Sequence, residues 1–225
     1  FGAPFWRPDG SSLLVQWMPR EQNNLKLYDI DLASGSKKQI YNEEQSTWIN
    51  WIKNLRWLKA GFLMIRDFDG WEQIYYYAHD GRLIKKLTSG KNWRTEIERV
   101  DEKTKTVYYS SNAEISTRSD LYQVQLDGSK QKRITFGDYS HTRTLLSPNE
   151  QYLITTYSNS STPPQMALMN VKKGSRKVIA DSKGSRYDVS KLDKREIVWL
   201  KTDDGLNLPG RVVWPSKWIR IKSIL

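Results

Sequence analysis

Residues Tyr108–Gly137 read YYSSNAEISTRSDLYQVQLDGSKQKRITFG, and this stretch decides how the rest of the chain is interpreted. Tyr, Val and Leu alternate with polar residues on both sides of a polar loop, which is the pattern of half-buried β-strands. The pair Asp127-Gly128 predicts a tight turn, because glycine tolerates the positive φ angle that such turns require. A third strand is expected to end at Gly137. The stretch therefore predicts three short strands joined by a loop and a turn.

The same pattern occurs four times along the chain. A turn glycine precedes the last strand of each unit, and successive glycines are 46, 47 and 46 residues apart. These glycines are Gly35, Gly81, Gly128 and Gly174. A period in the mid-forties with about four short strands per unit is typical of a β-propeller, in which each unit forms one blade. A β-sandwich with evenly spaced hairpins is the alternative, and the three matching intervals favour the propeller.

The chain is accordingly predicted to be all-β, with about four four-stranded blades of a propeller fragment in residues 1–185. The expected blades cover about residues 1–45, 46–90, 91–137 and 138–184. The pattern changes in residues 186–225, where a strand at Glu196–Lys201, a turn at Asp204-Gly205 and a second strand from Leu208 predict a hairpin outside the repeat. We expect the second strand of this hairpin to belong to another domain.

Composition excludes several classes of function. The 225 residues include no cysteine, which rules out a disulfide framework and a thiolate metal site or nucleophile, and no apolar run is long enough to span a bilayer. The net charge is +11, but residues from Lys172 onward hold 14 Lys and Arg against 6 Asp and Glu. The body of the chain is therefore close to neutral, and its basic residues are scattered, so nucleic-acid binding is not favoured.

Few residues qualify as candidates for a site. Trp48 and Trp51 belong to an aromatic run that reads either as packing between blades or as part of a ligand pocket. The segment Asp67–Glu72 resembles a calcium loop only at its start and lacks the distal glutamate, so a hairpin turn explains it. Arg118 and Asp120 are expected to form a surface ion pair worth at most about 1 kcal/mol. No cofactor and no metal site are predicted.

Several stretches together resemble the later propeller blades of the dipeptidyl-peptidase IV branch of the prolyl oligopeptidase family, particularly its bacterial members. The resemblance covers about residues 1–215. The stretches that carry it are FWRPDG from Phe5, QWMPREQNNLKLYDIDLASG from Gln16, RDFDGWEQIYYY from Arg66, KKLTSG from Lys85, YYSSNAEISTRSDLYQVQLDG from Tyr108, LSPNEQYLITTYSNSSTPPQMAL from Leu146 and KTDDGLNLPGRVVWP from Lys201. The last of these is similar to the start of the family's C-terminal α/β-hydrolase domain.

The resemblance implies a function. In this family the propeller caps a hydrolase, restricts access to short or unfolded peptides and contributes loops to the substrate pocket. The hydrolase carries a Ser-Asp-His triad and removes N-terminal dipeptides with proline or alanine next to the cut. Trp48 and Trp51 lie roughly where the family places residues beside the substrate. Membership also implies a periplasmic or secreted location.

The sequence departs from the complete family pattern. It contains no G-x-S-x-G nucleophile elbow, and its two histidines, His79 and His141, both lie in propeller repeats. The glutamates that hold the substrate's amino terminus in the family have no match here. We therefore expect this chain to gate and support a peptide site but to be inactive as a peptidase by itself.

Two further expectations follow from the predicted fold. Four blades leave open edges and apolar faces, so the chain is expected to associate with itself through them. A different class of function, a non-enzymatic interaction propeller that binds a protein partner, remains the alternative. The hairpin at Thr202–Pro215 argues against it, because a free-standing scaffold has no need of that segment.

Overall fold

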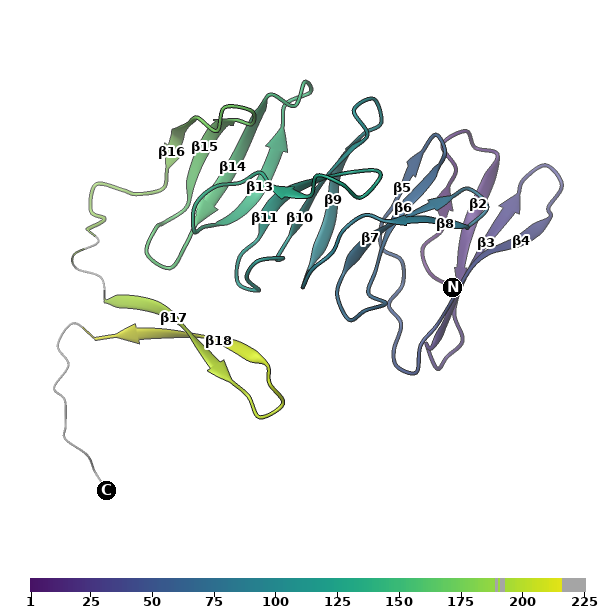
Figure 1. Cartoon of the computed structure of the whole chain (residues 1–225), viewed down its shortest axis with the longest axis horizontal. Helices are drawn as coiled ribbons and strands as arrows, with labels where there is room; N and C mark the ends of the chain where they lie inside the picture. Colours follow the sequence, from purple (N-terminus) through teal and green to yellow (C-terminus); the bar gives the residue numbers. More distant parts are fainter. Residues whose placement is uncertain (189, 191–192, 216–225) are drawn as a thin grey trace. The chain divides into compact units, whose positions relative to one another are not determined.

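The computed structural model describes residues 1–188, 190 and 193–215, and it confirms an all-β fold (Figure 1). Each of four antiparallel sheets contains four strands that follow one another in the chain. The first sheet, blade 1, contains β1 (Phe5–Trp6), β2 (Ser12–Trp17), β3 (Asn24–Asp31) and β4 (Lys37–Glu44). The second, blade 2, contains β5 (Leu55–Leu58), β6 (Gly61–Arg66), β7 (Gln73–Ala78) and β8 (Leu83–Lys86).

The other sheets continue the repeat. Blade 3 contains β9 (Thr95–Asp101), β10 (Thr106–Ser111), β11 (Asp120–Gln125) and β12 (Lys132–Arg133). Blade 4 contains β13 (Ser140–Leu146), β14 (Tyr152–Ser158), β15 (Gln165–Asn170) and β16 (Arg176–Asp181). A separate hairpin is formed by β17 (Lys194–Lys201) and β18 (Asn207–Trp214), with its turn closed by the Gly205 N–H and the Thr202 carbonyl. That this hairpin opens a hydrolase domain stays a prediction.

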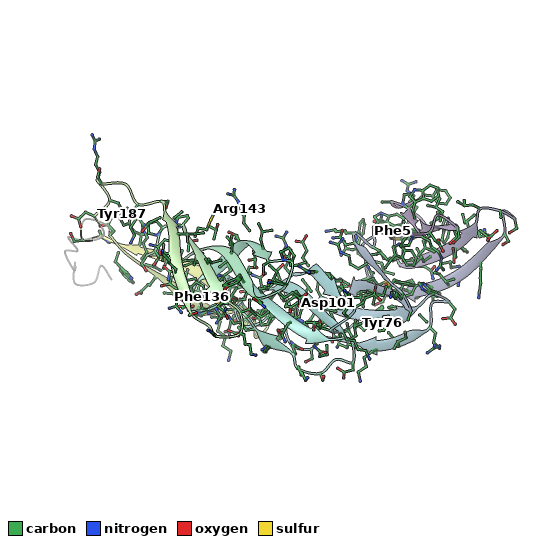
Figure 2. The ribbon with its side chains drawn as sticks, turned by 90° about the horizontal axis from the view of Figure 1, so that it is seen from above. Phe5, Tyr76, Asp101, Phe136, Arg143 and Tyr187 are labelled. Atoms are coloured by element: carbon green, nitrogen blue, oxygen red, sulfur yellow. The ribbon has the colours of Figure 1, made fainter. Side chains whose placement is uncertain are left out.

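The chain divides into two compact units. Unit 1 consists of residues 1–113 and 122–133, and unit 2 consists of residues 114–121 and 134–225. Unit 1 has two apolar clusters, one between blades 1 and 2 and one between blades 2 and 3. In unit 2, Phe136 (labelled in Figure 2) packs edge-to-face on His141 and Tyr157. The blades of unit 1 are thus stabilised through the faces of their sheets, which is how stacked repeats obtain a continuous core.

Blade 1 is joined to the segment that follows it by the side chain of Gln16, which is fully buried. Its amide nitrogen donates to the carbonyls of Ala3 and Ile52 at 2.7 and 3.0 Å, and its oxygen accepts from the Ile52 N–H at 2.8 Å. One side chain therefore satisfies both backbone groups of a buried residue that lies outside any strand.

In both blade 2 and blade 3, a threonine that follows the fourth strand forms hydrogen bonds with the start of the third strand. The Thr88 hydroxyl accepts from the Ile74 N–H at 3.0 Å and donates to Gln73 at 2.7 Å. The Thr135 hydroxyl likewise accepts from the Leu121 N–H at 3.2 Å and donates to Asp120 at 2.7 Å. The sequences KKLTSG and KRITFG share this threonine because its hydroxyl satisfies a backbone N–H of the third strand beyond the end of the fourth strand.

The repeated turn glycine has a steric role at Gly81. Gly35 and Gly81 both have positive φ, at 70° and 88°, which side chains of L-residues rarely adopt. A Cβ atom on Gly81 would lie 1.5 Å from the Ile40 carbonyl oxygen in β4, whereas a Cβ atom on Gly35 would meet nothing within 4 Å. At Gly81 the turn of one blade therefore rests directly on the backbone of the preceding blade.

This contrast predicts different costs for the same substitution at equivalent turns. Gly35→Ala should lower the free energy of unfolding by about 1 kcal/mol, the cost of positive φ alone. Gly81→Ala adds the displacement of blade 1 from blade 2, so we expect a loss of about 3 kcal/mol or more. Urea unfolding followed by circular dichroism measures both values. Equal losses for the two variants would show that the contact with Ile40 does not contribute to stability.

Candidate functional site

A polar pocket lies in unit 1, where the segment between blades 1 and 2 meets blade 2 and the start of blade 3. It is bordered by the segment that connects β4 to β5, by the end of β6 with the turn that follows it, and by the start of β9. The pocket has a volume of about 100 Å³ and is lined by Asn50, Trp51, Lys53, Asn54, Ile65, Arg66, Asp67, Glu72 and Thr95. Loops placed by rigid strands are where binding residues concentrate in β-folds, so this pocket is the candidate site.

Arg66, which lines the pocket, forms a buried ion pair with Glu43 that joins blade 2 to blade 1. The Arg66 guanidinium donates to both carboxylate oxygens of Glu43, at 2.7 and 2.8 Å, and its third nitrogen donates to the Asn50 carbonyl at 3.0 Å. The side chains of Arg66 and Glu43 are only 3% and 1% exposed. This bidentate geometry fixes the end of β6 and the segment at Asn50 to the last strand of blade 1.

Two more side chains complete the hydrogen bonding of Glu43. The Tyr41 hydroxyl and the Gln45 amide each donate to the carboxylate at 2.7 Å. Burial opposes the charge on Arg66, but its hydrogen bonds to Glu43 outweigh this and raise the pKa of the guanidinium. Burial, together with the adjacent Glu43 carboxylate, raises the pKa of the Tyr41 hydroxyl far above its usual range. Arg66 therefore keeps its charge, and Tyr41 keeps its proton.

Breaking this pair should be costly because one charge would remain buried without its partner. We expect Arg66→Met to lower the free energy of unfolding by about 3–5 kcal/mol. The matched control is Lys86→Met, which removes an exposed pair with Asp69 at 2.5 Å and should cost less than about 1 kcal/mol. Urea unfolding of the two variants and the wild type measures the difference. A loss for Arg66→Met as small as that for the control would contradict a structural role of the pair.

Glu72 and Thr95 also line the pocket. The Thr95 N–H donates to the Glu72 carboxylate at 2.5 Å, and the Thr95 hydroxyl donates to the Glu72 carbonyl at 3.0 Å. These bonds tie the turn after β6 to the first residue of β9. The side chains of Lys53 and Asp67 also line the pocket and form no hydrogen bond or ion pair within the described part of the chain. The pocket thus offers charged groups of both signs to a ligand.

The two predicted site residues occupy different environments. Trp51 lines the pocket and packs against the apolar cluster between blades 1 and 2. Its ring also lies close to Gly2, where a Cβ atom would be only 2.6 Å from a ring carbon. Trp48 is 65% exposed and does not line the pocket. The two tryptophans could not be separated from the sequence, because the connecting segment has no strand periodicity. Arg66 and Glu43 were missed, although a charged residue at the end of the apolar run FLMIR was a usable signal.

The remaining candidates from the sequence have structural surroundings. Asp67–Glu72 forms the turn between β6 and β7, closed by a 2.9 Å bond from the Gly70 N–H to the Asp67 carbonyl. The ring nitrogens of His79 contact an Arg7 guanidinium nitrogen at 3.0 Å and the Lys59 carbonyl at 3.1 Å. His141 is buried, with its ring nitrogens on the Phe136 carbonyl and the Thr155 hydroxyl. Neither histidine lies beside a serine in the manner of a catalytic dyad in these contacts.

The expected pair of Arg118 and Asp120 forms, but it is more buried than a surface pair. The Arg118 guanidinium contacts three carboxylates, those of Asp120 and Asp138 at 2.8 Å and that of Glu114. Asp120 is buried, at 1% exposure, and its carboxylate also accepts a hydrogen bond from the Thr135 hydroxyl. The reason is that the loop before β11 folds onto the start of blade 4, which brings Asp138 to Arg118 from 20 residues away. The arginine therefore organises a loop of unit 2 from a half-buried position.

Among the described residues, no helix is long and apolar enough to cross a membrane. The repeated four-stranded sheets define this chain as a β-propeller region with a loop-lined polar pocket.

Comparison with known proteins identifies the family. Residues 4–164 match the sequence profile of the family described as "Dipeptidyl peptidase IV (DPP IV) N-terminal region". This match covers more than half of the chain, and the chain belongs to that family. The predicted resemblance is thereby confirmed.

Similar proteins agree with this assignment. Dipeptidyl peptidase 4 of Arthroderma otae is 28% identical over 133 residues, which are 56% of this chain and 17% of that protein. A probable dipeptidyl-aminopeptidase B of Neosartorya fischeri is 27% identical over 185 residues, 72% of this chain and 19% of that protein. The crystal structure of Porphyromonas gingivalis dipeptidyl peptidase 4 superposes with a TM-score of 0.76 at 25% identity, covering 92% of this chain and 30% of that one. The matched part of this chain thus spans less than a fifth of the first two proteins and 30% of the third.

Proposed function

We propose that this chain is part of the propeller of a serine exopeptidase that removes N-terminal dipeptides with proline or alanine at the second position. In this proposal the chain gates and supports the peptide site. The family match over residues 4–164, together with a superposition that covers 92% of the chain, is the observation that carries it. Two of the relatives named above are dipeptidyl peptidases by name, and the third is a probable dipeptidyl-aminopeptidase.

The chemistry of the pocket supports a role in peptide binding. An extended peptide presents amide groups, apolar side chains and charges of both signs. Trp51 offers an apolar surface, Asn50 and Asn54 carry amides, and Lys53, Asp67 and Glu72 supply charge. A mixed lining of this kind suits a peptide better than it suits a purely apolar or purely anionic ligand.

The chain by itself is proposed to have no peptidase activity. Hydrolysis through an acyl-enzyme needs a nucleophile activated by a base and held by an acid. The sequence contains no G-x-S-x-G motif, and the contacts of His141 and His79 involve backbone carbonyls, an arginine and a threonine. The hydrolytic step would accordingly be performed by groups outside these residues.

Immunodepletion of an extract of the cells that make this chain tests the proposed activity. Antiserum raised against residues 1–215 should remove most hydrolysis of a chromogenic Ala-Pro amide, and the precipitate should recover it. The purified chain should release no chromophore from the same substrate. Antiserum absorbed beforehand with the purified chain is the control and should leave the extract active.

Two outcomes would overturn this function. Hydrolysis by the purified chain would contradict the absence of a catalytic triad. Full activity remaining in the depleted extract, with a protein partner in the precipitate that has no hydrolase, would replace the peptidase assignment by that of an interaction propeller.

The contributions of Trp51 and Trp48 are tested separately by peptide binding to the purified chain. Calorimetric titration with an Ala-Pro peptide should show binding weakened about 10-fold by Trp51→Ala, because the large indole ring buries apolar area against the peptide and a tenfold loss corresponds to about 1.4 kcal/mol. Trp48→Ala should have a smaller effect, since this side chain lies on the open surface. Trp199→Ala, in β17, is the control for loss of an exposed tryptophan and should bind as the wild type does. Unchanged binding in both Trp51→Ala and Trp48→Ala would remove these residues from the site.

A further inference from the structure

One side of the pocket is formed by residues 49–54, which lie between β4 and β5 and belong to neither strand. Two of these residues, Ile49 and Ile52, are buried and belong to the apolar cluster between blades 1 and 2. The other four, which line the pocket, are Asn50, Trp51, Lys53 and Asn54. Because this segment has no partner strand, other contacts must decide which of its side chains face the core and which reach the pocket.

Side chains of blades 1 and 2 hold the backbone of this segment. The Asn50 carbonyl accepts a hydrogen bond from Arg66 at 3.0 Å. Ile52 is held at both of its backbone groups by Gln16 in β2: the amide oxygen of Gln16 accepts the Ile52 N–H at 2.8 Å, and the amide nitrogen donates to the Ile52 carbonyl at 3.0 Å. Gln16 thus pairs with Ile52 as a residue of a neighbouring strand would, but through its side chain.

Gln16 is a polar residue on an apolar face. Leu14 and Gln16 are two residues apart in β2 and both fully buried, and Leu14 belongs to the apolar cluster between blades 1 and 2. A buried amide costs free energy unless it is hydrogen-bonded, whereas an apolar side chain of similar size fills the same space without this requirement. Gln16 meets the requirement through the carbonyl of Ala3 and both backbone groups of Ile52. Such a residue fixes one arrangement of the backbone.

The orientation of Ile52 decides the pocket on this side. Its side chain enters the apolar cluster, and its two neighbours in the chain, Trp51 and Lys53, both line the pocket. The donor and the acceptor that hold Ile52 belong to one planar carboxamide, so a rotation of the Ile52 backbone would break at least one of the two bonds. Gln16 therefore fixes the direction in which Trp51 and Lys53 leave the backbone.

We infer that Gln16 is a positioning residue of the pocket: through Ile52 it holds Trp51 and Lys53 where a peptide meets them. Gln16 does not line the pocket and acts only through the backbone of residues 49–54. This role rests on the proposed function, the binding of a peptide at this pocket. All the residues involved lie in unit 1. Side chains that are ordered before the peptide arrives lower the entropic cost of binding.

Two substitutions separate the holding of Ile52 from the filling of space. Gln16→Met keeps a long, unbranched side chain but removes both hydrogen bonds to Ile52. Gln16→Glu keeps the shape, and its protonated carboxyl group can still donate one hydrogen bond and accept the Ile52 N–H, whereas the ionised carboxylate can only accept. Burial raises the pKa of such a carboxyl group, so acidification toward about pH 5 restores the donor.

Calorimetric titration of the full chain with the Ala-Pro peptide, at about pH 5 and about pH 8, measures the effect. Relative to the wild type at the same pH, Gln16→Met should bind about 10-fold more weakly at both values, because the peptide then has to order Trp51 and Lys53 itself. Gln16→Glu should bind more weakly than the wild type at the higher pH and approach it at the lower one. Filling of space alone would not produce this pH dependence, because both forms of the carboxyl group have the same size.

Amide hydrogen exchange of the free chain, followed by mass spectrometry over residues 49–54, tests the same contact without a ligand. Gln16→Met should lose protection in this segment. Thr106→Val is the matched control, because it removes a different buried hydrogen bond, that from the Gln125 amide at 2.9 Å. Thr106 lies at the opposite end of β10 from Ser111, the residue that pairs with Thr95. This control should bind the peptide and protect residues 49–54 as the wild type does.

Three outcomes would overturn the role of Gln16. Equal peptide affinity of the wild type and Gln16→Met, or unchanged protection of residues 49–54 in this variant, would overturn it and leave the proposed function standing. Binding by Gln16→Glu that is equally weak at both pH values would assign the loss to packing. A wild type that binds no peptide would instead overturn the proposed function and this role together. Circular dichroism should show the same strand content in all variants.

Discussion

The structure depends on one constraint: the central strands of blade 2 are apolar on both sides. In β6, Phe62, Leu63 and Met64 are all fully buried, although consecutive side chains of a strand point to opposite faces. A sheet of this kind has no face to turn toward water, unlike an antiparallel sheet with one solvated side. Blade 2 is stable because blade 1 covers one face and blade 3 covers the other. The repeat in the sequence is the consequence of this mutual covering.

The buried pair of Glu43 and Arg66 adds specificity to this packing. Two apolar sheet faces can pack in several relative positions, because hydrophobic contacts are not directional. A bidentate pair with two further donors on the carboxylate is satisfied only in one arrangement, so a shift of blade 2 along blade 1 would leave a charge buried and unpaired. The same pair places Asn50 and the end of β6 beside Trp51 and so sets the shape of the pocket.

Local features of the sequence were sufficient to predict the sheets. Alternating apolar residues and turn glycines such as Gly81 and Gly128 act within a few residues, so the strands and their period could be read directly. The site was less accessible. Glu43 and Arg66 are 23 residues apart and meet only because two sheets stack, and Asp138 reaches Arg118, 20 residues away, through the folding of the loop before β11. Trp48 and Trp51 lie in a connecting segment without periodicity, so only the structure separates the exposed ring from the pocket wall.

The polar links within unit 1 have a consequence for the order in which the chain acquires structure. Gln16 holds Ile52 and Glu43 holds Arg66, over separations of 36 and 23 residues, so both links join blade 1 to the sequence that follows it. A ribosome delivers the chain from its amino terminus, and blade 1 is therefore complete before the residues that dock on it emerge. Because these contacts join parts of the chain that are close in sequence, the blades can fold one at a time during synthesis, and each folded sheet offers a face on which the next one packs.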